Sequence, residues 1–249
     1  MPKNYQSDAA KRGLKVEQAL IEKINNRDPD CLWIVEECCE STGYGNFKAA
    51  KPDNHEKPDL IIYPEIANNT VSQGISLKSY KKGVSFCQAN RGKLETFVRD
   101  LEIPDDVSET LRLFTIADSN GERVMLNKAP LDKQKTLLDF FTKSQKNIVT
   151  QVLQGRFHAS LKANWMLFHE TIIGTWQNNV GNKSFWRLYS MELIINICCS
   201  IPPALSKKGN LDLGLGITLQ RKGGDNGEET ANDLQFKIKP VKIIKALSK

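Results

Sequence analysis

An aspartate and a lysine stand in the most strand-like part of the chain, the stretch KPDLIIYPEIANNTVSQGISLKSYKKG from Lys57 to Gly83. Asp59 opens the first apolar run, and Lys78 lies two residues after Ser76 in the second. An unpaired ion in a protein interior is costly, and the group usually shifts its pKa to become neutral instead. A reason is therefore needed for an acid and a base in this hairpin.

Strand geometry could bring the two charged side chains, Asp59 and Lys78, together at one site. Side chains alternate between the faces of a strand, so Ser76 shares a face with Lys78, and Asp59 shares one with Ile61 and Tyr63. If the two runs pair, Asp59 and Lys78 converge at one end of the sheet. The carboxylate could hold Mg²⁺, and the lysine could orient an attacking water. Residue types alone leave a purely structural ion pair equally open.

Periodicity predicts the elements that would position these residues. Apolar residues at near-helical spacing predict an amphipathic helix over residues 8–25. The β-forming residues 31–39 predict a strand, and the polar residues 41–57 predict a loop. Residues 90–153 have a helical pattern punctuated by prolines, and 213–240 form two alternating runs around a glycine-rich turn, typical of a β-hairpin.

This order of elements predicts the fold class α/β (α+β), with a mixed central β-sheet flanked by helices, a helical insertion and a C-terminal β-hairpin. We expect a single domain over residues 1–249. Its catalytic core would begin in residues 1–90, its helical region would occupy 91–160, and residues 161–249 would supply a helix and the hairpin.

Composition favours a globular protein with an anionic partner. The chain has 249 residues, 40% of them hydrophobic, and its net charge of +6 leans toward a polyanion without requiring one. Its six cysteines include no C-x-x-C pair, the N-terminal residues lack an apolar signal core, and no apolar run is long enough to span a membrane. We therefore expect reduced thiols and a cytoplasmic protein.

The segment PDLII followed by SLK resembles the PD…(D/E)xK motif of a large nuclease superfamily. More specifically, the chain resembles type II restriction endonucleases of the HinP/MspI kind. AAKRGLKVEQALIEKI is similar to the first helix of that family, SYKKGVSFCQANR to its basic segment after the catalytic lysine, and ITLQRKGGDNGEETANDLQFKIKP to a C-terminal hairpin. The resemblance implies a restriction endonuclease-like fold and Mg²⁺-dependent cleavage of double-stranded DNA.

The resemblance also implies roles for individual residues. Asp59 would be the metal-binding acid and Lys78 the catalytic lysine, while Ser76 stands where many relatives have an acid or an amide. The backbone carbonyl of Leu77 and the carboxylate of Glu17, on the first helix, would complete the metal site. Because a hydroxyl is a weaker and neutral ligand, Ser76 leaves the site with one negative charge fewer.

Glu65 is a competing second acid, since it lies on the Asp59 face by parity. Pro64 is expected to interrupt the strand ladder before it. Glu17 itself is also a plausible solvated residue of a surface helix.

Basic and amide side chains that could contact DNA occur in three segments. Lysine and arginine neutralise phosphates, arginine can also read guanine, and glutamine and asparagine can read adenine. The candidates are Lys81, Lys82, Ser85, Gln88, Asn90 and Arg91 after the motif, Arg156 in the middle of the chain, and Gln220, Arg221 and Lys222 in the hairpin. The competing interpretation is a solvated basic loop and an ordinary hairpin turn.

Two classes of function follow from these residues. The first is a type II restriction endonuclease that requires Mg²⁺ and cuts a short double-stranded sequence. The second is a DNA-binding module whose nuclease site has decayed, suggested by Ser76; a structure-specific repair nuclease on the same fold is a further alternative. The sequence leaves both a monomer and a homodimer open.

Overall fold

The structure is a computed structural model that describes residues 8–39, 46–53, 56–65, 71–81, 86–117, 121–155, 161–171, 179–222 and 232–248. The helices are α1 (Asp8–Asn25), α2 (Pro29–Cys39), α3 (Leu94–Asp100), α4 (Asp105–Thr115), the 3₁₀ turn η1 (Leu126–Lys128), α5 (Leu131–Lys143), α6 (Gln145–Gln154), α7 (Met191–Cys198) and α8 (Pro240–Leu247). The strands are β1 (Asn46–Ala50), β2 (Leu60–Glu65), β3 (Gln73–Lys81), β4 (Cys87–Gly92), β5 (Trp165–Thr171), β6 (Trp186–Ser190), β7 (Ala204–Leu205), β8 (Leu211–Gly214), β9 (Ile217–Arg221) and β10 (Leu234–Ile238).

The chain divides into two compact units, and neither is a continuous stretch of sequence. Unit 1 comprises Met1–Val84 and His158–Glu192, and unit 2 comprises Ser85–Phe157 and Leu193–Lys249. Each unit contains a five-stranded sheet with flanking helices, which confirms the predicted mixed α+β fold class. The expectation of one domain stays a prediction.

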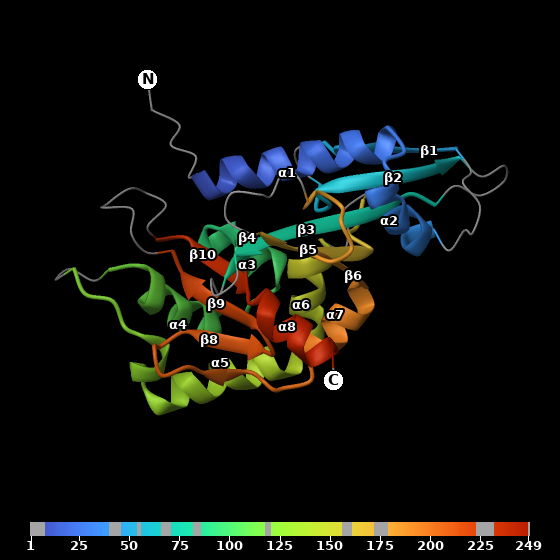
Figure 1. The fold of residues 1–249 in the computed structure, drawn as a ribbon. Coiled ribbons are helices and arrows are strands. Elements are labelled where there is room, and N and C mark those ends of the chain that lie inside the picture. Colours follow the sequence, from blue (N-terminus) through green and yellow to red (C-terminus); the bar gives the residue numbers. More distant parts are fainter. Residues whose placement is uncertain are drawn as a thin grey trace, which may run out of the picture. The chain divides into compact units, whose positions relative to one another are not determined.

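The sheet of unit 1 has the strand order β1-β2-β3-β5-β6 (Figure 1). Strands β3 and β5 are parallel, and the other neighbours are antiparallel. Helix α1 packs along this sheet because Val16, Leu20 and Ile24 recur every four residues and are fully buried against its apolar side chains. The predicted helix over residues 8–25 and the predicted pairing of β2 with β3 are confirmed.

A close backbone approach fixes the start of β3. The amide N–H of Gly74 donates to Oδ1 of Asn164 at 3.1 Å, and the amide of Asn164 donates to the Gly74 carbonyl at 2.7 Å. A side chain on Gly74 would collide with the carbonyl oxygen of Lys162. Only glycine therefore lets β3 lie this close to the segment that leads into β5.

The sheet of unit 2 is antiparallel throughout, in the order β4-β10-β9-β8-β7. Its apolar face carries Phe236, whose ring meets Phe97 of α3 edge-on with centroids 5.2 Å apart. Strands β9 and β10 form the predicted C-terminal hairpin; its turn, residues 223–231, lies outside the described residues. Its strands thus belong to a second sheet and not to the one that carries Asp59 and Lys78.

Three expectations about the N-terminal region are wrong. Residues 31–39 form most of helix α2 and not a strand, because Cys31, Ile34, Val35 and Cys38 are buried on one helical face. The polar stretch 41–57 is not all loop, since it contains strand β1, whose Phe47 and Ala49 are buried. Pro64 also does not interrupt β2, which continues to Glu65 and pairs with β1 there.

The helical interpretation of residues 90–153 is confirmed for α3, α4, α5 and α6, whereas Asn90 to Gly92 belong to β4. All six cysteines are free thiols. No helix in the described part of the chain is long and apolar enough to cross a membrane.

Candidate active site

Strand pairing brings Asp59 next to Ser76. Leu60 lies opposite Ile75 in the antiparallel register of β2 and β3, and the amide of Asp59 donates to the Ile75 carbonyl at 2.8 Å. Asp59 therefore continues the ladder by one residue and faces Ser76. After Ile75, β3 continues to pair with β5, and the Asp59 carboxylate accepts the amide of Leu77 on β3.

Three donors converge on one oxygen of Asp59. Oδ2 accepts a hydrogen bond from Oγ of Ser76 at 3.1 Å, from the amide of Leu77 at 2.6 Å and from Nζ of Lys78 at 3.2 Å. Within the described residues, Oδ1 accepts none. The carboxylate is thus held through Oδ2 by three donors from β3.

Lys78 is held from two sides. Its Nζ contacts Oδ2 of Asp59 and also donates to the Leu77 carbonyl at 3.0 Å. Only 12% of its side chain is exposed, against 27% for Asp59. Such a partly buried, hydrogen-bonded ammonium keeps a defined position at the edge of β3.

Glu17 of α1 faces the same site. Burial raises the pKa of its carboxyl, and the nearby negative charge of Asp59 raises it further. Oε2 of Glu17 lies 3.7 Å from Nζ of Lys51, just after β1, and this positive charge partly offsets the shift. Of the two proposed second acids, Glu17 is thus electrostatically coupled to Asp59, while the side chain of Glu65 lies outside the described residues.

Lys57 is a site residue that we did not anticipate from the sequence. Burial and, to a smaller extent, the Lys78 ammonium lower the pKa of its amine to about 7, while Asp59 acts in the opposite direction. The signal was its spacing, because in an extended chain Lys57 falls on the same side as Asp59. Two amines therefore share the field of one carboxylate.

The oxygen atoms at this site fit a hard divalent cation. Asp59 and Glu17 supply carboxylates and Leu77 supplies a backbone carbonyl, which are the ligand types that Mg²⁺ takes. No cluster of three or more histidine, cysteine, aspartate or glutamate side chains that could hold a metal is found in the described residues. The donor set suits an ion that keeps water and phosphate among its ligands, and it does not suit zinc.

The candidate DNA-binding residues Gln88, Arg91 and Gln220 meet on one sheet of unit 2. Strand β10 lies between β4 and β9, with Gln235 opposite both Arg91 and Gln220. One step along, Lys237 lies opposite both Gln88 and Thr218. Directly opposed residues share a face, so these side chains form two polar rows across three strands.

The remaining candidates are placed differently. Asn90 lies opposite the buried Phe236, on the other face from Arg91, and its Oδ1 accepts the Arg91 amide at 2.8 Å. Arg221 ends β9, and the amide of Lys222 donates to the Asp233 carbonyl at 2.8 Å. The side chain of Lys81, together with Lys82, Ser85 and Arg156, lies outside the described residues.

Comparison with known proteins identifies the family. The family model described as R.HinP1I restriction endonuclease matches residues 97–244, more than half of the chain. The chain belongs to the R.HinP1I restriction endonuclease family. As a member, it is a type II site-specific deoxyribonuclease, as the sequence resemblance predicted.

A solved structure supports the fold of this restriction endonuclease. A crystal structure of restriction endonuclease MspI in complex with its cognate DNA aligns with a TM-score of 0.54 and 12% sequence identity, covering 94% of this chain and 81% of that chain. No curated protein matches the sequence significantly. Because the family match begins after Lys78, the roles of Asp59 and Lys78 depend on their own geometry.

Proposed function

We propose that this restriction endonuclease requires Mg²⁺ and hydrolyses DNA phosphodiester bonds at a short, specific double-stranded sequence. The observation that carries the proposal is the contact of Asp59 with Lys78, together with the Ser76 hydroxyl and the Leu77 amide on the same carboxylate oxygen. A solitary structural ion pair would not need two further donors that leave one carboxylate oxygen free.

Asp59, through Oδ1, would hold the ion together with Glu17 and the Leu77 carbonyl. Bound Mg²⁺ supplies positive charge at the phosphate and lowers the pKa of a bound water. Glu17 lies close enough for the negative charge of Asp59 to raise its pKa, which supports placing both carboxylates at one ion. Ser76 keeps the Asp59 carboxylate oriented, which a hydroxyl can do without being a ligand itself.

Lys78 would position the attacking water and stabilise charge on the phosphate. Its ammonium is donor-only and is fixed by Asp59 and the Leu77 carbonyl, so its remaining hydrogen can point to a water or a phosphate oxygen. In-line attack forms a bond from the water oxygen to phosphorus and breaks the bond from phosphorus to the leaving oxygen. The water loses a proton and the leaving oxygen gains one.

Sequence recognition would come from the exposed members of the two polar rows of unit 2, Gln88 and Arg91 on β4. Strands can read base edges in the major groove, and guanidinium and amide side chains are the groups that do so with bidentate hydrogen bonds. MspI was crystallised with its cognate DNA, and the shared fold makes double-stranded DNA the natural partner of this chain as well.

The test is cleavage of a plasmid of known sequence in Mg²⁺, followed by sequencing of the fragment ends. We expect discrete fragments from the parent and none from Lys78→Ala or Asp59→Ala, while Lys78→Ala still retards a duplex carrying the site. Lys133→Ala is a matched control, because Lys133 also lies 3.2 Å from an acid, Glu109. It should cut at the parental rate.

Parental cleavage by both Lys78→Ala and Asp59→Ala would contradict the proposed site. An intact but retarded plasmid with the parent would instead indicate a binding module with a decayed nuclease site. Cleavage restricted to flaps or junctions would indicate a structure-specific nuclease. Fragment ends with two-fold symmetric sequence, compared with the mass of the free protein in solution, would separate a homodimer from a monomer that cuts the strands in turn.

A further inference from the structure

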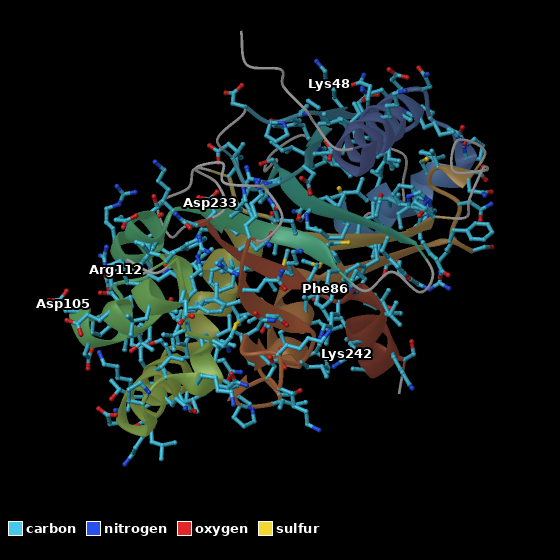
Figure 2. The ribbon with its side chains drawn as sticks, turned by 90° about the vertical axis from the view of Figure 1, so that its left-hand side faces the viewer. Lys48, Phe86, Asp105, Arg112, Asp233 and Lys242 are labelled. Carbon is cyan, nitrogen blue, oxygen red and sulfur yellow. The ribbon has the colours of Figure 1, made fainter. Side chains whose placement is uncertain are left out.

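A buried carboxylate, that of Asp233, pairs with Arg91, the most exposed residue of the row Arg91–Gln235–Gln220. Asp233 immediately precedes β10 and is 8% exposed, and Oδ2 of Asp233 lies 3.6 Å from Nε of Arg91 on β4. The Arg91 side chain is 40% exposed. A buried carboxylate is costly unless it is paired, and Arg91 is the partner that the fold provides. Figure 2 labels Asp233 at this end of the sheet.

A backbone hydrogen bond fixes the position of Asp233. The Asp233 carbonyl accepts the amide of Lys222 at 2.8 Å, which ties the start of β10 to the end of β9. The preceding residue, Asn232, accepts a hydrogen bond at its Oδ1 from Nη2 of Arg123 at 2.9 Å. Two successive residues thus each engage a different arginine.

The choice of arginine nitrogen decides what Arg91 can do. A guanidinium has five N–H donors, one on Nε and two on each terminal nitrogen. Nε is the Arg91 nitrogen that contacts Asp233, and neither terminal nitrogen has a protein acceptor in the described residues. These two nitrogens form the fork that binds N7 and O6 of guanine.

The surroundings favour an anionic or electron-rich ligand at this place. Arg221 ends the neighbouring strand β9, and burial together with the charge of Arg123 lowers the pKa of its guanidinium. Gln235 is 5% exposed and lies between Arg91 and Gln220 in register, so Arg91 is the exposed end of its row. Several cationic groups thus lie around a row that presents hydrogen-bond donors.

We propose that Asp233 is a positioning residue that holds Arg91 by Nε, so that the two terminal nitrogens of Arg91 read a guanine in the major groove of the recognition site. This inference rests on the proposed cleavage of a specific duplex, and it names one base of that site and the residue that prepares the reader. Holding the guanidinium in advance saves the rotamer entropy that a free arginine would lose on binding.

The experiment measures binding with 7-deazaguanine, which lacks the N7 acceptor. The duplex is the one identified from the fragment ends, each guanine is replaced in turn, and all proteins carry Lys78→Ala so that the duplex stays intact. We expect at least one guanine whose replacement weakens binding about tenfold. Arg91→Ala and Asp233→Asn should each reduce that penalty to about twofold or less, and Asp233→Glu should restore most of it.

Glu95→Gln is the matched control, because Glu95 pairs with Arg112, also labelled in Figure 2, at the same N–O distance of 3.6 Å. It should keep the full penalty. A merely structural role of Asp233 would weaken all duplexes alike, so a full 7-deazaguanine penalty in Asp233→Asn overturns the inference, as does the absence of a penalty at every guanine in the parent.

A scrambled duplex shows whether Asp233→Asn is folded. If Asp233→Asn binds the scrambled duplex with the parental affinity, the variant is folded. If it does not, Asp233→Glu is compared with the parent instead. No fragments from the wild-type chain and equal binding of specific and scrambled duplexes would instead refute the proposed function itself.

Discussion

At the scale of single residues, the site is organised around one carboxylate oxygen. The Ser76 hydroxyl, the Leu77 amide and the Lys78 ammonium all donate to Oδ2 of Asp59. A serine in place of a second acid thus removes one negative charge but adds a donor to the remaining acid. The departure from the PD…(D/E)xK pattern changes how Asp59 is held, and it leaves the carboxylate in place.

Ser76→Ala tests this role. Ser76 is 1% exposed, and removal of its hydroxyl takes away one of three donors, so we expect unfolding free energy to fall by about 1 kcal/mol. Because Asp59 is then held less precisely, the single-turnover cleavage rate should fall severalfold, short of the complete loss in Asp59→Ala. Cleavage and urea denaturation measure the two effects.

Ser108→Ala is the control for that pair of measurements. Ser108 is 8% exposed and its Oγ donates to the Asp105 carbonyl at 2.9 Å within α4. It should cost comparable stability and leave the cleavage rate unchanged. Equal rates for Ser76→Ala and the parent would show that the hydroxyl does not orient Asp59.

The proximity of Asp59, Ser76 and Lys78 could be predicted from the sequence because all three lie on two strands that are close together in the chain. Alternation across a short hairpin was enough to bring Asp59, Ser76 and Lys78 together. Lys57 was missed because its lowered pKa comes mainly from burial in the folded chain, which the sequence pattern does not give. Asp233 was missed for a similar reason, since its partner Arg91 lies on a strand more than a hundred positions earlier.

At the scale of elements, residues 31–39 have the composition of a strand, but their packing makes them part of helix α2. Helix α2 contains isoleucine, valine and tryptophan, yet its buried residues follow helical spacing, and Pro29 and Asp30 occupy its first turn. The amide of Asp30 donates to Oδ1 of Asp28 just before the helix. Residue preferences favoured a strand, while the spacing and the helix start, both visible in the sequence, favoured the observed helix.

Glycine-to-alanine substitutions at Gly74 on β3 and at Gly13 on α1 should have opposite effects on stability. In Gly74→Ala the new methyl group would collide with the Lys162 carbonyl, so β3 must shift and we expect a loss of at least about 2 kcal/mol. In Gly13→Ala the methyl group meets nothing within 4 Å on α1, and stability should rise by about 0.5–1 kcal/mol. Thermal or urea unfolding measures both.

The sign of these two effects is the decisive observation. A neutral or stabilising Gly74→Ala would mean that β3 and the segment before β5 are not in close contact. Gly74→Ala should also slow cleavage, since displacement of β3 moves Ser76 and Lys78 with it.

The parallel pair β3 and β5 predicts a pH effect through His169. This histidine is fully buried, its ring stacks on Trp186 with centroids 4.2 Å apart, and Nδ1 lies 3.3 Å from Oγ of Ser79. Nε2 has no hydrogen-bond partner in the described part of the chain. Burial lowers the pKa of His169 to about 4, so the ring is neutral in the folded protein at neutral pH.

The unfolded chain binds more protons than the folded chain between pH 4 and the ordinary histidine pKa near 6.5. Stability should therefore fall as pH drops through this range, by on the order of 2 kcal/mol between pH 7.5 and 5 from this group. His169→Gln should lose that part of the slope in urea denaturation at the two pH values. Equal slopes for variant and parent would contradict a buried neutral ring.

At the scale of the whole molecule, the net charge of +6 makes DNA binding sensitive to salt. Lys222 directly follows β9, the strand that carries Gln220 of the Arg91 row. If Lys222 neutralises one phosphate, Lys222→Gln should reduce the slope of log affinity against log salt by about 0.9, equally for specific and scrambled duplexes. Fluorescence anisotropy between 50 and 200 mM salt, approximately the range over which such effects are large, gives the slope.

Lys133→Gln serves as the control, because Lys133 lies on α5 and not beside the β4, β10 and β9 strands. It should leave the salt slope unchanged. A Lys222→Gln slope equal to that of the parent would place Lys222 outside the phosphate contacts.

The two units are interleaved, because the chain passes from one to the other after Val84, after Phe157 and after Glu192. The sheet that carries Arg91 and Asp233 is therefore assembled from two separated stretches, and so is the sheet that carries Asp59 and Lys78. Grafting the unit 2 sheet of a relative onto this enzyme would need three joints instead of one, because unit 2 consists of two separate stretches of the chain. New sequence specificities in this family should accordingly arise more readily by point substitution at exposed β4, β9 and β10 positions than by exchange of whole segments.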